Sequence, residues 1–335
     1  MYSTSIASLN GGDISINAGG LVNVGSADFV VNSTSALGIF STSHGNVSVT
    51  AVGNIDINGS RIATYDGGNL AIESLNGNVD AGNGAGGSVV VYDFSVDPNT
   101  YVVNSSVVTI HGSGILATTF PDSLSTVGNI LVETPNGTIS ANQAGISQFH
   151  LNEVNSPNAT VTLLAGYDLQ DGLPVLISPD RNIDVSGSGV IAQNASLTAS
   201  GSINGLIFAR GNSDVVAQQN VNVTVLAQGT ANVSAGGTVS GTIIGVGGVS
   251  ASGSSIDASL ISNNSISGAT TGQSGTTEGT AANATSTAAS NSDANQAAAT
   301  ATTGDATDDD LKKKKPIALA QKVGRVTVLL PAKNN

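Results

Sequence analysis

A short phrase recurs four times between residues 45 and 81, and it constrains the fold more than any other feature of the chain. Each copy has Gly-Asn followed by two apolar or small residues on either side of one variable residue: GNVSV at 45–49, GNIDI at 53–57, GNLAI at 68–72 and GNVDA at 77–81. The first and third copies start 23 residues apart, and the second and fourth start 24 residues apart. Repeats of this length are typical of solenoids, in which stacked neighbours bury an apolar face that one repeat cannot bury alone.

The residues inside each phrase predict a strand that follows a corner. Ile55 and Ile57 lie two positions apart, as do Leu70 and Ile72, so these side chains share one face of a strand and point inward. Gly-Asn stands where the chain turns, because positive φ is cheap for Gly and tolerable for Asn. Asn-Gly pairs also form hairpins, but successive steps of 8, 15 and 9 residues favour a coil with several faces over a simple meander.

The core must be built from small aliphatic side chains, because the chain has no Trp and only 3% aromatic residues. Ordinary globular cores bury several large aromatic side chains, whereas a narrow stacked core suits Val, Ile, Leu and Ala. The chain also has no Cys, which excludes disulfides, thiolate catalysis and Cys-ligated metal sites. Only 10% of the residues are charged, which suits an extracellular setting.

The charges are distributed unevenly along the chain. All 23 acidic residues precede Leu311, whereas seven of the ten basic residues lie in the last 24 positions. The body keeps only Arg61, Arg181 and Arg210 against these acids, so it repels nucleic acid phosphates and anionic lipids. No run of 18 apolar residues exists, which excludes a transmembrane helix.

The repeats predict a parallel β-helix over residues 1–267, and at about 23 residues per coil this body makes on the order of 11 coils. Two irregular passages, 96–127 and 150–180, interrupt the repeats and are expected to project as loops. Residues 268–311 have too little apolar area to fold and are expected to form a disordered linker. A basic tail, 312–335, follows with a possible final strand, indicated by the alternation of Val326, Val328 and Leu330.

The first ten residues contain neither a basic stretch nor an apolar stretch of a signal peptide. They also show no evident polar cap for the first coil, which solenoids normally have. We therefore expect the chain to be the C-terminal portion of a longer protein, or else residues 1–10 to act as a minimal cap.

Candidate metal sites are weak in this sequence. Asp308–Asp310 are adjacent carboxylates that suit a hard cation, but a solvated charge run is the simpler interpretation. The stretch GNGAGGSVV at 82–90 resembles glycine-rich calcium-binding nonapeptides yet lacks the ligand aspartate. His44, His111 and His150 are far apart in sequence and form no metal-binding spacing.

Asp180 and Arg181 are the residues that an enzyme would most plausibly use. β-Helices include polysaccharide lyases and hydrolases, which need paired carboxylates or a base beside a positive charge in one groove. With three basic residues in the body, an anionic polysaccharide would meet an acidic surface. The simpler interpretation is that Arg181 occupies a corner.

Asn-X-Ser/Thr triplets occur at several positions, for example at Asn46, Asn104, Asn158 and Asn222. They follow from a composition rich in Asn, Ser and Thr, so they are weak evidence for glycosylation. Asn at repeated corners favours a different role, a ladder of side-chain amides along the solenoid.

The Gly-Asn-Ile/Val/Leu phrases, the uncharged polar surface, the lack of Cys and the ending GRVTVLLPAK resemble the filamentous haemagglutinin-like exoproteins. These are large adhesins of Gram-negative bacteria, exported by two-partner secretion. The resemblance covers 1–267 and 312–335, and it implies a right-handed parallel β-helix without catalytic residues. Of the family's Asn-Pro-Asn secretion motifs, only Asp97-Pro98-Asn99 and Ser156-Pro157-Asn158 come near.

We therefore expect an all-β, right-handed parallel β-helix that acts as a non-enzymatic adhesin at the cell surface or in the medium of a Gram-negative bacterium. We expect no catalytic residue, no cofactor and no metal. The expected partners are glycans or proteins of host or neighbouring cells, and an outer-membrane secretion partner if the chain is part of a larger exoprotein. A carbohydrate-active β-helix enzyme is the alternative, and a remnant without function is a third possibility.

Overall fold

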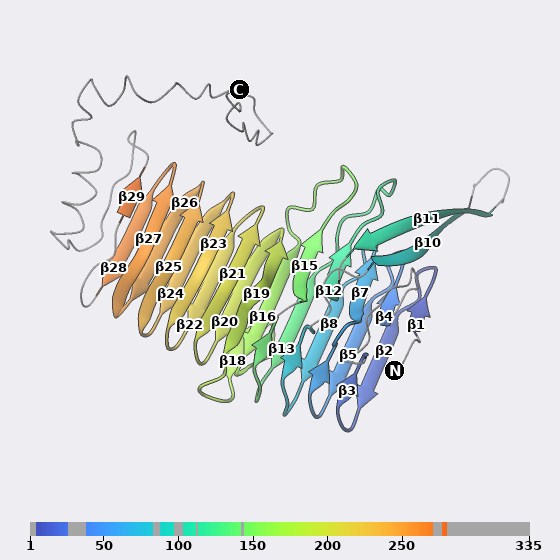
Figure 1. Ribbon diagram of the computed structural model, residues 1–335, viewed down its shortest axis with the longest axis horizontal. Helices are drawn as coiled ribbons and strands as arrows, with labels where there is room; N and C mark the ends of the chain where they lie inside the picture. Colours follow the sequence, from blue (N-terminus) through green and yellow to red (C-terminus); the bar gives the residue numbers. More distant parts are fainter. Residues whose placement is uncertain are drawn as a thin grey trace, which may run out of the picture.

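The computed structural model describes residues 5–25, 38–82, 88–96, 103–111, 113–141, 144–270 and 277–279. Within these residues the protein is entirely β, and its strands stack along one axis as a parallel β-helix (Figure 1). The predicted fold class is confirmed. None of the described residues belongs to a helix that is long and apolar enough to cross a membrane.

Two long parallel sheets form the walls of the solenoid. The first, sheet B, has ten strands in the order β2 (Ile14–Ala18), β5 (Val47–Ala51), β8 (Leu70–Ser74), β13 (Ile130–Thr134), β16 (Thr160–Ala165), β20 (Asn194–Ala199), β22 (Ser213–Ala217), β24 (Thr230–Ala235), β26 (Gly248–Gly253) and β28 (Ile266–Thr270). Each coil therefore contributes one strand to this wall.

The second wall, sheet A, contains fifteen strands. Its main path is β1 (Ser5–Ser8), β4 (Gly38–Ser41), β7 (Arg61–Tyr65), β12 (Gly114–Thr118), β15 (Gly145–Phe149), β19 (Ile183–Ala192), β21 (Ile203–Ala209), β23 (Val221–Ala227), β25 (Thr238–Gly245), β27 (Ser255–Ser262) and β29 (Thr277–Gly279).

Among the described residues, a third, narrower face lies in the N-terminal half. It consists of the short strands β3 (Val22–Asn23), β6 (Ile55–Asp56), β9 (Val79–Asp80) and β14 (Ile139–Ser140), which pair in that order. β14 then pairs with the beginning of β19, while β15 pairs with its end. From β19 onward, one long strand thus replaces a short strand, a corner and a second strand.

The repeat period seen in the sequence is confirmed where it was found. Val47 pairs with Leu70 and Ile55 pairs with Val79, which are the steps of 23 and 24 residues. The extension of this period to the whole body was wrong, because corresponding corner residues after β20 lie 18 residues apart. The coil shortens because the third face merges into sheet A.

The core is a set of in-register columns between the two walls. One column of sheet A passes through nine successive strands as Ile39, Ile62, Ile115, Ile146, Val190, Ile207, Val225, Ile243 and Leu260. All nine side chains are buried. Burial of each such side chain stabilises the fold by about 1.5–3 kcal/mol, so small aliphatic residues suffice for a core of this width.

The Gly of the recurring phrase is required by close stacking of the corners. A Cβ on Gly68 would overlap the carbonyl oxygen of Gly45 in the preceding coil, and a Cβ on Gly128 would overlap that of Gly68. At the second corner, a Cβ on Gly137 would meet the carbonyl oxygen of Gly77. The backbone of one coil therefore approaches the next too closely for any side chain.

The Asn of the phrase ties each corner to the next. The backbone amide of Asn69 donates to Oδ1 of Asn46 at 2.9 Å, and that of Asn129 donates to Oδ1 of Asn69 at 2.9 Å. Asn78 and Asn54 are joined in the same way at the second corner, at 3.0 Å. The phrase's Asn residues do form a ladder, but the predicted pairing of side-chain amides is wrong for them, because their bonds run from backbone amides to side-chain oxygens. Side-chain amides pair between coils at other positions, from Asn58 to Asn23 and from Asn136 to Asn76.

We predict that Gly68→Ala destabilises the protein by about 1–3 kcal/mol, because the new methyl group forces the corner away from Gly45. Thermal unfolding followed by circular dichroism measures the effect. Gly19→Ala is the matched control, since no heavy atom lies within 4 Å of its Cβ position. Equal melting temperatures for the two variants would contradict the steric account.

The first predicted irregular passage, 96–127, is more regular than expected. β10 (Ser88–Val96) and β11 (Val103–His111) form an antiparallel hairpin that projects from the solenoid (Figure 1). β12 belongs to sheet A, with Ile115 between Ile62 and Ile146 in the core column. Among the residues of this passage that the structure describes, 119–129 form a loop within the solenoid coil. The prolines near this stretch therefore obscured the hairpin and the wall strand in the sequence.

The second predicted passage, 150–180, likewise contains a strand of the wall. β16 pairs with β13 and β20 in sheet B, and its Val161 and Leu163 are buried. A short antiparallel hairpin, β17 (Tyr167–Gln170) and β18 (Leu173–Leu176), follows directly. The passage is therefore a loop at 150–159, a wall strand and a hairpin.

Two strands extend past residue 267, the predicted end of the repeat region. β28 ends at Thr270, and β29 pairs with β27. The rest of the linker and the tail 312–335 lie outside the described residues.

Candidate functional site

Two loops widen the same corner of the solenoid in successive coils. The first loop, residues 119–129, joins β12 to β13, and the second loop, residues 150–159, joins β15 to β16. In the preceding coil the corresponding connection, from β7 to β8, is only residues 66–69. Because β12 pairs with β15 and β13 with β16, the two loops rise side by side at one edge (Figure 1).

Hydrogen bonds fasten the two loops to each other. The side-chain amide of Asn152 donates to the carbonyl oxygens of Ser123 at 2.9 Å and Ser125 at 2.8 Å. The backbone amide of Val127 donates to Oγ of Ser156 at 3.0 Å. Asn152 and Ser156 are both buried, so the two loops form one ordered unit. We call this unit, residues 119–129 and 150–159, the ledge.

An aromatic cluster on the outer face of sheet A holds the start of the first loop. Phe120 stacks on Tyr65 with ring centroids 6.2 Å apart, and Phe40 meets Tyr65 edge-on at 5.8 Å. Nη1 of Arg61 donates to the Tyr65 hydroxyl at 3.4 Å. Burial raises the pKa of Tyr65, while the positive charge of Arg61 lowers it. These contacts make the base of the ledge rigid.

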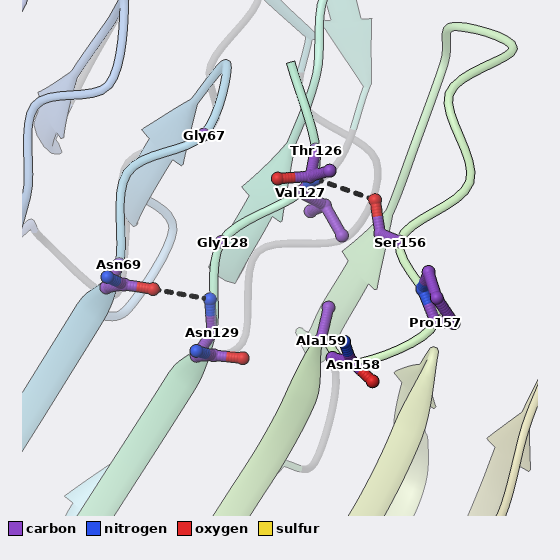
Figure 2. Close-up of a pocket in the computed structure, with 10 residues that line it drawn as sticks. All are labelled: Gly67, Asn69, Thr126, Val127, Gly128, Asn129, Ser156, Pro157, Asn158 and Ala159. Atoms are coloured by element: carbon purple, nitrogen blue, oxygen red, sulfur yellow. Dashed lines mark hydrogen bonds between the residues drawn. The ribbon is translucent and has the colours of Figure 1, made fainter.

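A hollow of about 360 Å³ lies between the ledge and the corner ladder (Figure 2). Its lining consists of uncharged residues: Gly67, Asn69, Thr126, Val127, Gly128, Asn129, Ser156, Pro157, Asn158 and Ala159. The bonds between coils use the side-chain oxygens of Asn69 and Asn129. Their amide nitrogens, together with the side chain of Asn158, present neutral donors and acceptors suited to hydroxyl groups.

A second candidate group is a cluster of three carboxyl groups on the outer face of sheet B. Glu133 of β13 lies beside Glu73 of β8 in register, and Asp168 of β17 approaches from the short hairpin. Burial raises the pKa of Glu133 to about 7, the neighbouring Asp168 and Glu73 add to the rise, and the Leu169 amide that donates to it at 2.6 Å opposes it. Glu133 therefore exchanges a proton near neutral pH.

Among the described residues, no group of three His, Cys, Asp or Glu side chains is arranged to hold a metal ion. Sequence reasoning missed Glu133, although its place could have been found by aligning repeats. Glu73 and Glu133 occupy the same position in LAIES and ILVET.

The histidines singled out in the sequence are not brought together as a site. Nε2 of His44 lies 3.4 Å from Oγ of Ser125, so His44 supports the first loop. His150 lies in the second loop, with Nδ1 2.8 Å from the carbonyl oxygen of Asn152 and Nε2 2.6 Å from Nη1 of Arg210. His111 is in β11 of the projecting hairpin.

Asp180 and Arg181 occupy a corner. Asp180 has left-handed backbone geometry, with φ of 61°, and its carboxylate accepts a hydrogen bond from the side chain of Gln219. The backbone amide of Arg181 donates to Oγ of Ser200 at 3.0 Å. Asp308–Asp310 lie outside the described residues, as does much of the glycine-rich stretch 82–90.

Residues 67–163 match the sequence model of a family described as "Filamentous haemagglutinin family outer membrane protein". This segment is filamentous haemagglutinin-like. The resemblance inferred from the repeat phrases is thus confirmed over these residues, and the family description places such proteins at the outer membrane. All residues that line the hollow fall inside the filamentous haemagglutinin-like segment. No curated protein and no solved structure matches the chain significantly.

We predict that Asn152→Ala separates the two loops, because it removes both hydrogen bonds to the first loop and leaves two partly buried carbonyl oxygens without this donor, at a cost of about 1–3 kcal/mol. Amide hydrogen exchange in residues 119–129 reports the change as faster exchange. Asn158→Ala is the control, since this side chain faces the hollow and fastens no loop. Unchanged exchange in Asn152→Ala would show that the loops are held by other contacts.

We predict that the stability of the protein falls as the pH rises from about 5 to 7. The native state retains the Glu133 proton in this range because the pKa of Glu133 is raised from 4.5 to about 7, whereas the unfolded chain releases it. Glu133→Gln should remove this fall, which is on the order of 1–2 kcal/mol after screening by water. Melting temperatures measured across this pH range test the expectation.

The control for this measurement is Glu153→Gln, which changes an exposed carboxylate in the second loop. It should follow the unmodified protein at every pH. If Glu133→Gln retains the same pH dependence as that control, Glu133 is not the group responsible.

Proposed function

We propose that this protein is a non-enzymatic adhesin-like structural element, secreted or held at the surface of a Gram-negative bacterium. Its parallel β-helix serves as a rigid stalk, and the ledge formed by the two loops makes contact with the partner. The observation that carries the proposal is the hollow of about 360 Å³ beside the ledge, which is polar, uncharged and rigidly framed. Loops on a rigid scaffold commonly carry recognition.

The chemistry of the hollow favours surface glycans as the partner, or proteins that present amide and hydroxyl groups. Its Asn, Ser and Thr side chains and backbone groups pair with hydroxyls. Nucleic acid is a poor partner, because only three basic residues precede Leu311 against 23 acidic residues. An outer-membrane secretion partner belongs to this proposal if the chain is part of a larger exoprotein.

A binding experiment with the purified protein tests the proposal. We expect the protein to bind glycan arrays or cultured cells, and Asn158→Trp to weaken binding at least about tenfold by filling the hollow. Asn222→Trp is the matched control, because Asn222 is exposed on β23 of sheet A, well outside the lining of the hollow. Absence of binding, or equal binding by both variants, would contradict the proposed contact surface.

The location is tested independently by fractionating the native cells and probing with antibody against residues 128–267. Detection at the cell surface or in the medium supports the proposal. Detection in the cytoplasm alone would exclude an adhesin.

A carbohydrate-active enzyme remains the second candidate, because Glu133 keeps a proton near neutral pH beside Asp168 and Glu73. A general acid of a glycoside hydrolase needs this property. Against it, Glu133 is only 6% exposed and one of its oxygens accepts the Leu169 amide. Polysaccharide cleavage that is lost in Glu133→Gln, or in a double variant of Asp180 and Arg181, would favour the enzyme.

A further inference from the structure

One outward-facing column of side chains follows sheet A through the nine strands from β4 to β27. In order, its members are Phe40, Ala63, Leu116, Ser147, Ile191, Phe208, Leu226, Ile244 and Ile261, each paired in register with the next. The register continues to Ala7 on β1 and to Glu278 on β29, so the apolar part ends at Ile261. Eight of the nine residues from Phe40 to Ile261 are apolar, although outward positions of a solvated sheet are usually polar.

The N-terminal part of the column has its cover. Phe40, Ala63 and Leu116 are buried, and they pack in one cluster with Tyr65 and with Phe120 of the first loop. A segment of the same chain thus closes this half of the face.

The C-terminal part of the column is partly exposed to solvent. Ile191 and Leu226 are each 39% exposed, and the neighbouring Leu206 is also exposed. Phe208, Ile244 and Ile261 are half-buried. We call the five residues Ile191, Phe208, Leu226, Ile244 and Ile261 the apolar stripe. Contiguous exposed apolar residues of this kind mark interaction sites.

The stripe also contains a hollow of about 200 Å³. The register of β19 shifts between Val185 and Val190, and Gly189 in this bulge has φ of 75°. The hollow beside the bulge is lined largely by Gly189, Ile191, Leu206, Phe208 and Leu226, and no charged residue lines it. It has the size and chemistry to receive an aliphatic side chain.

The same chain contains an apolar segment without an assigned place. Residues 268–310 contain no Val, Ile, Leu, Met or aromatic residue. Apolar residues return at Leu311, Ile317, Leu319 and Val323, and the longest run is RVTVLLP at 325–331. In this run Val326, Val328 and Leu330 alternate as on one face of an extended strand. These residues lie outside the described part of the chain.

We propose that the segment 325–331 docks on the apolar stripe and covers the C-terminal half of sheet A. Val326, Val328 and Leu330 span roughly 13 Å when extended, and the five stripe residues span roughly 19 Å along the axis. The docked segment covers the stripe much as Phe120 covers the N-terminal half of the same column.

The path of the chain favours this occupant over an external one. The last described strand, β29, pairs with β27, which also carries Ile261 of the stripe. The 45 residues from 280 to 324 are enough chain to reach every part of the stripe, because a chain can extend by up to about 3.3–3.6 Å per residue. Tethering at this length holds the segment near the stripe at about millimolar effective concentration.

Charge acts in the same direction. The segment begins with Arg325 and is flanked by Lys322 and Lys333, whereas residues 1–270 contain 17 acidic residues against three basic ones. The basic flanks are thus attracted to the solenoid, while the uncharged centre of the segment faces the uncharged stripe.

Disulfide trapping tests the proposal, because the chain has no native Cys. The variant carrying Leu226→Cys and Val328→Cys should form an intramolecular disulfide at least about tenfold faster than one carrying Val216→Cys and Val328→Cys. Val216 is the matched control, since it is 44% exposed but lies on β22 of sheet B.

Three results would overturn the proposal: equal trapping rates in the two variants, no trapping in either, or preferential dimer formation by the single variant Leu226→Cys. The last would assign the stripe to contact between two copies. A second measurement is independent of the cysteines. A chain ending at Asp310 should bind several-fold more of an apolar fluorescent dye than the full chain, with unchanged circular dichroism, and equal dye binding would also refute docking.

Discussion

The structure depends on one contact that recurs at successive corners of the described chain, where the backbone of one coil meets the backbone of the next. Glycine allows the approach, since a Cβ on Gly68 or Gly128 would overlap the carbonyl oxygen of the preceding coil. The Asn that follows then fixes the distance, because its side-chain oxygen accepts the amide of the equivalent residue one coil later. Together they keep the apolar columns in register, which is what buries a core of Val, Ile and Leu.

The same contact explains how the solenoid carries its loops without losing order. The ladder passes from Asn46 to Asn69, to Asn129 and to Thr160, with 23, 60 and 31 residues between successive members and bond lengths of 2.9 Å throughout. The amount of chain between two corners is therefore irrelevant to the bond that joins them. Loops at this corner can therefore become longer without breaking the ladder. Two members of the ladder, Asn69 and Asn129, line the hollow in Figure 2.

Much of the fold could be predicted from the sequence, because the patterns that indicate strands and corners lie within a few residues of each other. Alternation of Ile55 and Ile57, and the recurrence of Gly-Asn, predict strand, corner and period, and the pairing of Val47 with Leu70 confirms them. The shortening of the coil to 18 residues was not predicted, because it follows from the merging of two strands into β19 and not from any phrase. β12 and β16 were hidden by neighbouring prolines and inserts that conceal the repeat.

The candidate site was harder to predict from the sequence, because it depends on contacts between residues that are far apart in the chain. The sequence indicated two inserts that project, but the hydrogen bonds from Asn152 to Ser123 and Ser125 join residues almost 30 positions apart. Such pairings depend on which coils are adjacent. The raised pKa of Glu133 likewise results first from burial, and then from Asp168 of a hairpin and the register neighbour Glu73, neither of which is close in sequence.

The direction of the strands has a mechanical consequence. The strands cross the long axis, and the hydrogen bonds between coils run along it. A force that pulls on one end is therefore resisted only by the hydrogen bonds of the terminal coil. That coil peels off before the next one is strained. Each coil of 18 residues then releases roughly 60 Å of extended chain. Under tension such a solenoid lengthens in discrete steps and absorbs energy at each one.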